Sequence, residues 1–197
     1  MSALQTLTSP WLHEEEIKKS RFIARAAPVA SPDQAMAWMA SVSEAGATHN
    51  CWAYRIGDAY RFHDDGEPGG TAGRPILQAI EGQGCDRVAV VVTRWYGGIK
   101  LGAGGLARAY GGSAAECLRV APRVDIVETG RLHMHCDFPG LALVSARIRE
   151  LGGEIEREVF VADGAELTVL APKDRLDAIA ARVTDATRGR VVPRVVE

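Results

Sequence analysis

The chain has 197 residues, of which 47% are hydrophobic, 24% charged and 6% aromatic. This composition is typical of a globular protein and excludes a disordered, collagen-like or disulfide-scaffold chain. The formal net charge of −2 gives no overall positive field, so binding of RNA or DNA would need a local patch. The length suits one large domain or two small ones.

Nothing in the sequence indicates a membrane span or a secretory signal. No stretch of eighteen consecutive residues is apolar, and the first 16 residues are polar and end in three glutamates. The four cysteines stand far apart without a C-x-x-C pair, which argues against a zinc ribbon or a thioredoxin-like motif. We therefore expect free thiols in a reduced, cytoplasmic protein. The cysteines are Cys51, Cys85, Cys117 and Cys136.

Strand and helix patterns alternate through the first part of the chain. Ser31, Pro32 and Gln34 supply an N-cap, a first-turn proline and a capping-box glutamine for a helix that Gly46 would end. The continuous apolar run at residues 88–92 is typical of a strand buried on both faces. In chain order, we expect a strand at residues 19–29, the helix after Ser31, strands at 51–56 and 60–63 joined by a turn at Gly57-Asp58, a short helix at 75–80, the strand at 88–92, and a helix from about 104 to 120.

After Pro122 the pattern changes to strand, helix, strand, strand, helix and strand. This is the order of the ferredoxin-like split unit, so we predict an α+β protein with two domains, residues 1–121 and 122–197. The first domain carries twelve Lys/Arg and twelve Asp/Glu, the second eleven and thirteen, so neither is basic as a whole. The elements expected here are strands at 125–137, 154–161, 166–170 and 191–195, and helices at 141–151 and after Pro172.

A glycine-rich segment at residues 93–108 reads TRWYGGIKLGAGGLAR and connects the buried strand to a helix. In this geometry backbone N–H groups converge and the helix dipole is positive, which favours a phosphate, nucleotide or RNA-backbone site. The alternative is that the glycines only permit tight turns and close packing, and no standard phosphate-loop motif decides between the two. The candidate binding residues are Arg74, Arg94, Trp95, Tyr96, Gly97, Gly98, Lys100, Gly102, Gly104, Gly105 and Arg108.

An acidic segment at residues 61–75 reads RFHDDGEPGGTAGRP. Its His63, Asp64, Asp65 and Glu67, with His49 nearby, are candidate metal ligands or acid–base groups. Asp-Gly and Pro-Gly-Gly turn chemistry explains most of the segment without a metal. We therefore assign no metal ligand, no cofactor and no catalytic residue, and we leave open whether residues 63–67 bind a metal.

Two other positions carry residue types used in chemistry. His133 and His135 lie two residues apart on one strand face beside Asp137, a spacing that would allow a shared metal. A polar outer sheet face explains them equally well. Ser113 has no nucleophile-elbow context, so we do not assign it as a catalytic serine.

Four stretches together resemble the IMPACT family, in particular its bacterial, YigZ-like branch. They are KSRFIA at 19–24, ATHNCWAYRIG at 47–57, FHDDGEPGGTAGRPIL at 62–77 and VVVTRWYGGIKLGAGGLARAY at 90–110. The resemblance implies that residues 1–121 adopt the fold of the second domain of a small-subunit ribosomal protein. It also implies a ferredoxin-like domain, similar to one of elongation factor G, for residues 122–197. Eukaryotic members regulate translation through a partner bound by an additional domain, which this sequence does not contain.

Two function hypotheses of different class follow. The first is a non-enzymatic RNA- or ribosome-associated protein, a translation regulator, that uses the glycine-rich loop as its contact surface. The second is a phosphate- or nucleotide-handling enzyme with the same loop as an anion cradle and Asp64 and Asp65 near a metal. The lack of a complete catalytic set favours the first hypothesis. A protein-interaction module remains a third reading, because a fold alone does not define a function.

Overall fold

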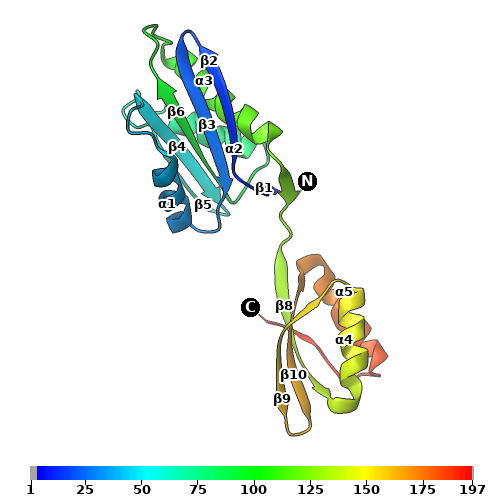
Figure 1. Ribbon diagram of the computed structural model, residues 1–197. Coiled ribbons are helices and arrows are strands. Elements are labelled where there is room, and N and C mark those ends of the chain that lie inside the picture. Colours follow the sequence, from blue (N-terminus) through cyan, green and yellow to red (C-terminus); the bar gives the residue numbers. More distant parts are fainter. Residues whose placement is uncertain (1–3, 197) are drawn as a thin grey trace. The chain divides into compact units, whose positions relative to one another are not determined.

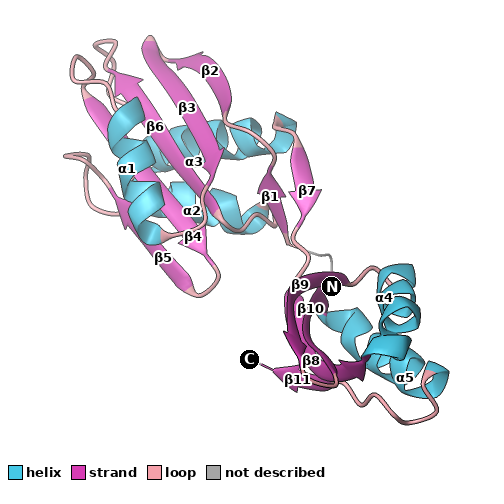
Figure 2. Cartoon of the chain, turned by 60° about the horizontal axis from the view of Figure 1, so that its bottom comes forward, coloured by secondary structure: helices cyan, strands magenta, loops and turns pink. Residues whose placement is uncertain are grey.

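The computed structural model describes residues 4–196 and divides into two compact units, Met1–Ile126 and Val127–Glu197. Unit 1 contains a five-stranded antiparallel sheet in the order β2-β3-β6-β4-β5, with α1 on one face and α2 and α3 on the other (Figures 1 and 2). A small second sheet pairs β1 with β7. The elements of unit 1 are β1 (Gln5–Leu7), β2 (Trp11–Ile17), β3 (Ser20–Pro28), α1 (Pro32–Val42), β4 (His49–Ile56), β5 (Ala59–His63), α2 (Gly73–Gly82), β6 (Val88–Trp95), α3 (Ala103–Val120) and β7 (Arg123–Asp125).

The central strand β6 is buried on both faces, as the sequence predicts. Val88, Val90 and Val92 pack in the core beneath α2 and α3, whereas Ala89 and Val91 pack toward α1. Side chains alternate across a strand, so a strand covered on both faces has no position that faces water. The pattern therefore places β6 in the middle layer, with its last residues, Arg94 and Trp95, leading into the glycine-rich loop.

The predicted cap of α1 is confirmed in its main contact. The backbone N–H of Gln34 donates to Ser31 Oγ at 3.2 Å, and Gln34 Oε1 accepts a hydrogen bond from the N–H of Ala30. The helix ends at Val42, earlier than the predicted stop at Gly46. Ser43 has an extended backbone there, and its hydroxyl donates to Met39 O.

The strands β1 and β2 were not expected from the sequence, and residues 125–137 form no single strand. The turn between β2 and β3 uses Lys18 and Lys19, whose φ values of 47° and 63° lie in a region that lysine rarely adopts. Without an Asn-Gly signal, this hairpin is not visible in the sequence. Since β7 pairs with β1, residues 122–126 belong to unit 1, and the division lies at Ile126 instead of Pro122.

Unit 2 follows the predicted order of elements. Its sheet has the order β11-β8-β10-β9, and both helices cover one face, so the unit is ferredoxin-like (Figure 2). Its own apolar core includes Leu132, Met134, Ile148 and Leu167. With the mixed first unit, this confirms the α+β class. The elements are β8 (Thr129–Asp137), α4 (Leu141–Glu150), β9 (Glu154–Val161), β10 (Gly164–Pro172), α5 (Leu176–Ala186) and β11 (Arg194–Val196), with 3₁₀ turns at Phe138–Gly140 and Lys173–Arg175.

Candidate anion-binding pocket

The acidic and glycine-rich segments meet at one open pocket in unit 1, with a volume of about 350 Å³. The pocket lies where β6 ends and α3 begins, and it combines apolar walls with three charged side chains. Its lining residues are Glu67, Pro68, Arg94, Tyr96, Lys100, Leu101, Gly102, Ala103 and Leu106. Two segments that are separate in the sequence therefore form one candidate site.

Asp64 shapes the acidic side of the pocket by closing its loop onto α2. Its carboxylate accepts backbone hydrogen bonds from Gly70 and Gly73 at 2.8 Å and from Ala72 at 3.0 Å. Partial burial acts to raise the pKa of Asp64, but these three donors outweigh it and hold the pKa below its ordinary value of 3.8. Asp64 is thus an N-terminal cap of α2 with its oxygens already used, and it holds the loop that carries Glu67.

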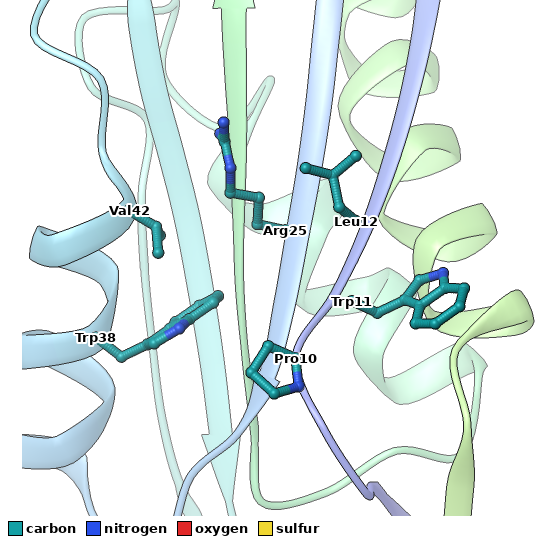
Figure 3. Close-up of a pocket in the computed structure, with 6 residues that line it drawn as sticks. All are labelled: Pro10, Trp11, Leu12, Arg25, Trp38 and Val42. Atoms are coloured by element: carbon teal, nitrogen blue, oxygen red, sulfur yellow. The ribbon is translucent and has the colours of Figure 1, made fainter.

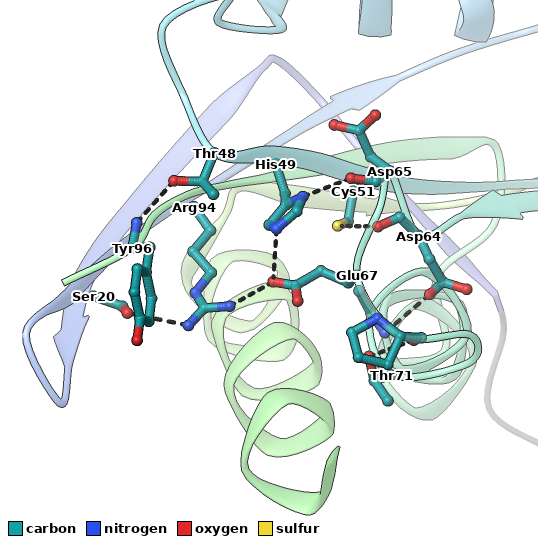
Figure 4. Close-up of polar contacts among 12 residues, drawn as sticks. Ser20, Thr48, His49, Cys51, Asp64, Asp65, Glu67, Thr71, Arg94 and Tyr96 are labelled. Atoms are coloured by element: carbon teal, nitrogen blue, oxygen red, sulfur yellow. Dashed lines mark hydrogen bonds and ion pairs between the residues drawn. The ribbon is translucent and has the colours of Figure 1, made fainter. Parts of the chain in front are cut away.

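Glu67 and Arg94 form an ion pair beneath the pocket. Arg94 Nη1 donates to Glu67 Oε1 at 2.6 Å, and the two side chains are only 6% and 4% exposed (Figure 4). The same oxygen accepts from the Tyr110 hydroxyl at 2.7 Å, and His49 Nε2 lies 3.8 Å from it. Burial raises the pKa of Tyr110 well above its usual range, so this hydroxyl stays a donor. These contacts tie β6, α3 and the acidic loop together.

The guanidinium of Arg94 is fixed on its other sides as well. Nη2 donates to Ser20 Oγ at 3.3 Å, and the guanidinium carbon lies 5.6 Å from the centre of the Phe22 ring and 5.3 Å from that of Tyr96. Its Nε is buried and has no hydrogen-bond partner among the described residues. Arg94 is thus a cation held in place at the pocket, and its Nε has no partner among the described residues.

The glycines of the loop serve different purposes. Gly97 packs against the turn between β2 and β3, since a Cβ there would lie 1.8 Å from Lys19 O, and its N–H donates to Ser20 Oγ at the start of β3. For Gly97 the packing interpretation therefore holds. Gly98 and Gly102 have φ values of 88° and 71° with open space around them, so they set the path of the loop.

The N-terminus of α3 opens on the pocket without a side-chain cap. Gly102 is the N-cap residue and makes no side-chain hydrogen bond, and the first-turn N–H groups, including that of Ala103, have no intrahelical acceptor. Lys100 is exposed beside them and makes no ion pair within residues 4–196. Backbone donors, the positive end of the helix and a lysine thus face one volume, which is the chemistry of an anion site.

Only part of the predicted residue set lines this pocket: Arg94, Tyr96, Lys100 and Gly102. The ring of Trp95 lies instead against Arg21, whose guanidinium carbon is 5.0 Å from the ring centre. Arg74 and Arg108 are exposed on α2 and α3 outside the lining residues. Sequence reasoning missed Tyr110 as a site residue, although a buried tyrosine hydroxyl signals a polar partner.

The candidate metal ligands of the acidic segment make hydrogen bonds with the backbone that hold its loop in place. Asp65 Oδ2 accepts from the N–H of Asn50 at 2.6 Å, and His63 Nδ1 accepts from the N–H of Asp65. His133 and His135 pair with separate acids, Glu166 and Asp163, on the sheet of unit 2. In the part of the chain that the structure describes, no three His, Cys, Asp or Glu side chains are arranged to hold a metal ion.

A second pocket of unit 1, about 450 Å³ in volume, lies between β2 and α1 (Figure 3). Its walls are mainly apolar, with Trp38, Leu12 and Val42 turned toward it. Its one charged residue, Arg25, pairs with Glu44 and also donates to Thr93 Oγ1. This pocket therefore offers no uncommitted charge, and the α3 pocket is the better candidate for chemistry.

The four thiols are free, as the sequence predicts, and all four cysteines are buried. Cys51 lies nearest to the pocket network and donates to Asp64 O, and burial raises its pKa to about 12. A thiol with that pKa stays protonated near neutral pH and is a poor nucleophile or metal ligand.

Comparison with known proteins defines the family. Residues 18–118 match the Impact N-terminal domain, and residues 134–190 match a domain of unknown function, DUF1949. An IMPACT family member of Thermus thermophilus, named for its place in the pol 5′ region, is 47% identical over 176 residues, which are 89% of this chain and 97% of that protein. The chain belongs to the IMPACT family.

Other relatives agree with this membership. The IMPACT family member YigZ of Escherichia coli is 36% identical over 185 residues, 89% of each chain. A crystal structure of a hypothetical protein, 33% identical, superposes with a TM-score of 0.73 over 100% of this chain and 98% of the other. Mouse Protein IMPACT is 43% identical over 95 residues, only 29% of its length. Within the described residues, no helix is both long and apolar enough to span a membrane.

Proposed function

We propose that this protein is a non-enzymatic, cytoplasmic RNA- or ribosome-associated protein that acts in translation regulation and holds a phosphate group of RNA in the α3 pocket. One observation carries the proposal: the uncapped start of α3, the unpaired Lys100 and the fixed Arg94 all lie at the same open pocket. Neither half of the chain is basic as a whole, so the protein has no overall positive field to attract RNA. Binding of RNA therefore needs a local group of positive charges and N–H donors like the one at this pocket.

The surroundings of the pocket suit a nucleic-acid strand. Tyr96 is 46% exposed at its edge and presents a ring on which a base can stack. The ammonium group of Lys100, on a flexible side chain, can adjust to the position of a phosphate. The backbone N–H groups in the first turn of α3 have fixed directions and can donate hydrogen bonds to it. Family membership supports the role in translation, because the resemblance to eukaryotic IMPACT proteins implies that activity.

The enzymatic alternative has one observation in its favour. The carboxylate of Glu67 lines the pocket, and the 3.8 Å contact with His49 makes the two an acid–base pair in reach of a bound nucleotide. It would have to work without Asp64, whose oxygens cap α2. Turnover of a nucleotide panel with divalent metal, measured for the whole protein, separates this alternative from a binding function.

The test of the proposed function is filter binding of labelled rRNA and tRNA over a salt series, with Lys100→Glu compared with the native protein. We expect lower affinity and a salt slope reduced by about one phosphate contact, with stability changed by less than about 0.5 kcal/mol because the site is exposed. Arg182→Glu is the matched control, since Arg182 is an exposed cation on α5 of unit 2 and is not among the residues that line the pocket. A Lys100→Glu protein with unchanged affinity and unchanged slope contradicts the proposal.

A further inference from the structure

The two edges of the large sheet in unit 1 differ in how well they are protected against pairing with another strand. β2 carries three consecutive glutamates, Glu14, Glu15 and Glu16, and Pro10 precedes it. Charged side chains and proline are the usual means by which an edge strand avoids pairing with a foreign chain. β5, at the opposite edge, contains no proline, lysine or acidic residue (Figure 2). It is therefore the less protected edge of this sheet.

Part of the β5 backbone has no partner among the described residues. Within residues 4–196, β5 pairs only with β4. Every second residue of an antiparallel strand directs its N–H and C=O groups to one neighbour, so the other groups of β5 point away from the sheet. No backbone hydrogen bond from a loop or turn reaches them. An added Cβ at Gly73 would lie 2.7 Å from the nitrogen of His63, so the start of α2 covers that end, and the free edge is residues 59–62.

The side chains along this free edge are aromatic and cationic. Tyr60 and Phe62 share one face of β5 and are 62% and 39% exposed. Arg61 lies on the other face, where its guanidinium carbon is 5.9 Å from the centre of the Trp52 ring. Arg61 makes no ion pair with the residues that the structure describes. An added strand would thus meet two apolar rings on one face and an unpaired positive charge on the other.

This charge decides what kind of strand fits. The neighbouring Arg55 of β4 pairs with Glu81 of α2, so Arg61 sets the charge along the free edge. A second copy of the chain, paired through its own β5 about a two-fold axis at the middle of the strand, would set Arg61 opposite itself. Like charges directly opposite each other on two strands are destabilising, whereas opposite charges are favourable. The edge therefore favours an acidic strand over a second copy.

We propose that the β5 edge is a docking site for an extended segment of a protein partner, which adds to the sheet as a further strand and alternates apolar with acidic side chains. Residues opposite each other on neighbouring strands share a face, so the apolar side chains lie beside Tyr60 and Phe62 and the acidic ones beside Arg61. Hydrogen bonds of the main chain supply affinity in this mode of recognition, and alternate side chains supply specificity. The inference goes beyond the proposed function, because it does not involve the α3 pocket.

The experiment measures the binding of three short fluorescent peptides to the full chain by anisotropy. The first alternates valine with glutamate, the second has lysine in place of glutamate, and the third is the first with methylated backbone nitrogens. We expect the glutamate peptide to bind about tenfold more tightly than the lysine peptide, and the methylated peptide not to bind, because it cannot donate to the edge. Arg61→Glu should reverse the preference between the first two. Arg157→Glu, the same change on the edge strand β9 of unit 2, should leave the preference unchanged.

Amide hydrogen exchange of the native protein then locates the bound peptide. We expect the glutamate peptide to slow exchange in residues 59–62 and not in β2. No binding, equal binding of the glutamate and lysine peptides, or slowed exchange in β2 alone overturns the proposal, and none of these results depends on a variant being folded. Slowing in residues 59–62 that grows with protein concentration without peptide identifies a second copy as the occupant. Slowing there by single-stranded RNA and not by the peptide identifies RNA, and either result overturns the proposal.

Discussion

The two units of this protein bury different kinds of side chains. Of the polar or charged residues buried in the described part of the chain, only Thr187 is in unit 2, where its hydroxyl donates to Val183 O at the end of α5. Those of unit 1 are Ser20, Glu67, Thr71, Asp86, Thr93, Arg94 and Ser113. Unit 2 instead keeps its ion pairs at the surface, as between Arg131 and Glu156.

This difference is consistent with the proposed binding site in unit 1. Taking an ion pair out of water costs free energy that its attraction does not always recover, so a buried pair is weak evidence for added stability. An apolar core of the kind in unit 2 folds without one. The Glu67–Arg94 pair is better explained by what it holds at the pocket, a fixed cation and a carboxylate.

The largest effect that tests this comparison is expected for Glu67→Ala. Removing the carboxylate leaves Arg94 buried without its counter-charge, which should lower the free energy of unfolding by about 3–5 kcal/mol. Urea unfolding followed by tryptophan fluorescence reports unit 1 alone, because Trp11, Trp38, Trp52 and Trp95 all belong to it.

The matched change in unit 2 is Glu156→Ala, which breaks the surface pair with Arg131. Exposed ion pairs contribute little, so the unfolding of unit 2 followed by circular dichroism should hardly change. If Glu67→Ala and Glu156→Ala both lowered the free energy of unfolding by similar, small amounts, the two units would not differ in this way.

A smaller effect is expected from Gly97→Ala, which tests the packing of the loop on the turn between β2 and β3. The new Cβ would overlap Lys19 O, and the shift needed to relieve this should cost about 1–3 kcal/mol. Gly104→Ala is the control. Gly104 lies in the first turn of α3, and an added Cβ there would meet only the end of the Arg108 side chain, at 3.5 Å. There alanine should stabilise α3 by about 0.5–1 kcal/mol. Chemical denaturation of both variants checks the opposite signs.

The next prediction concerns the stability of unit 1 at alkaline pH. Burial raises the pKa of Cys51 and of Cys117, both in unit 1, from an ordinary 9.0 to about 12. Between pH 9 and 12 the unfolded chain has lost these protons while the folded unit keeps them, so the free energy of unfolding falls as pH rises. Tryptophan-detected urea midpoints should decline over this window, and less steeply in Cys117→Ala. A flat profile up to pH 12 would contradict the burial of these thiols.

Much of this fold could be predicted because its patterns are local. The apolar run of β6, the helix that became α3 and the alternation of Leu132, Met134 and Cys136 in β8 each show within one segment. The strands β1 and β7 could not be predicted, since they pair across about 120 residues of sequence. The hairpin turn at Lys18 and Lys19 has positive φ values, which lysine residues do not predict.

The candidate site could be predicted as two motifs but not as one network of contacts. The glycine-rich loop and the acidic segment are visible as composition, and four of the candidate residues line the pocket. The contacts that join them are long in sequence: Arg94 reaches Glu67 across 27 residues and Ser20 across 74. Only the fold brings such partners together, so the pairing of Glu67 with Arg94 and Tyr110 has no signal in the sequence.

The smallest effect is expected when the units are separated. A fragment of residues 127–197 retains every member of the unit 2 core, from Leu132 to Val191, so it should fold alone. At about 70 residues its margin is thin, and the unfolding midpoint should lie within a few degrees of that of unit 2 in the whole chain. Thermal unfolding followed by far-ultraviolet circular dichroism checks this. A fragment that includes residues 122–126 should gain nothing, because β7 finds its partner β1 in the other unit. If the fragment shows no cooperative transition, unit 2 depends on unit 1 for its core, and the contrast between an independent apolar unit and a site-bearing polar one does not hold.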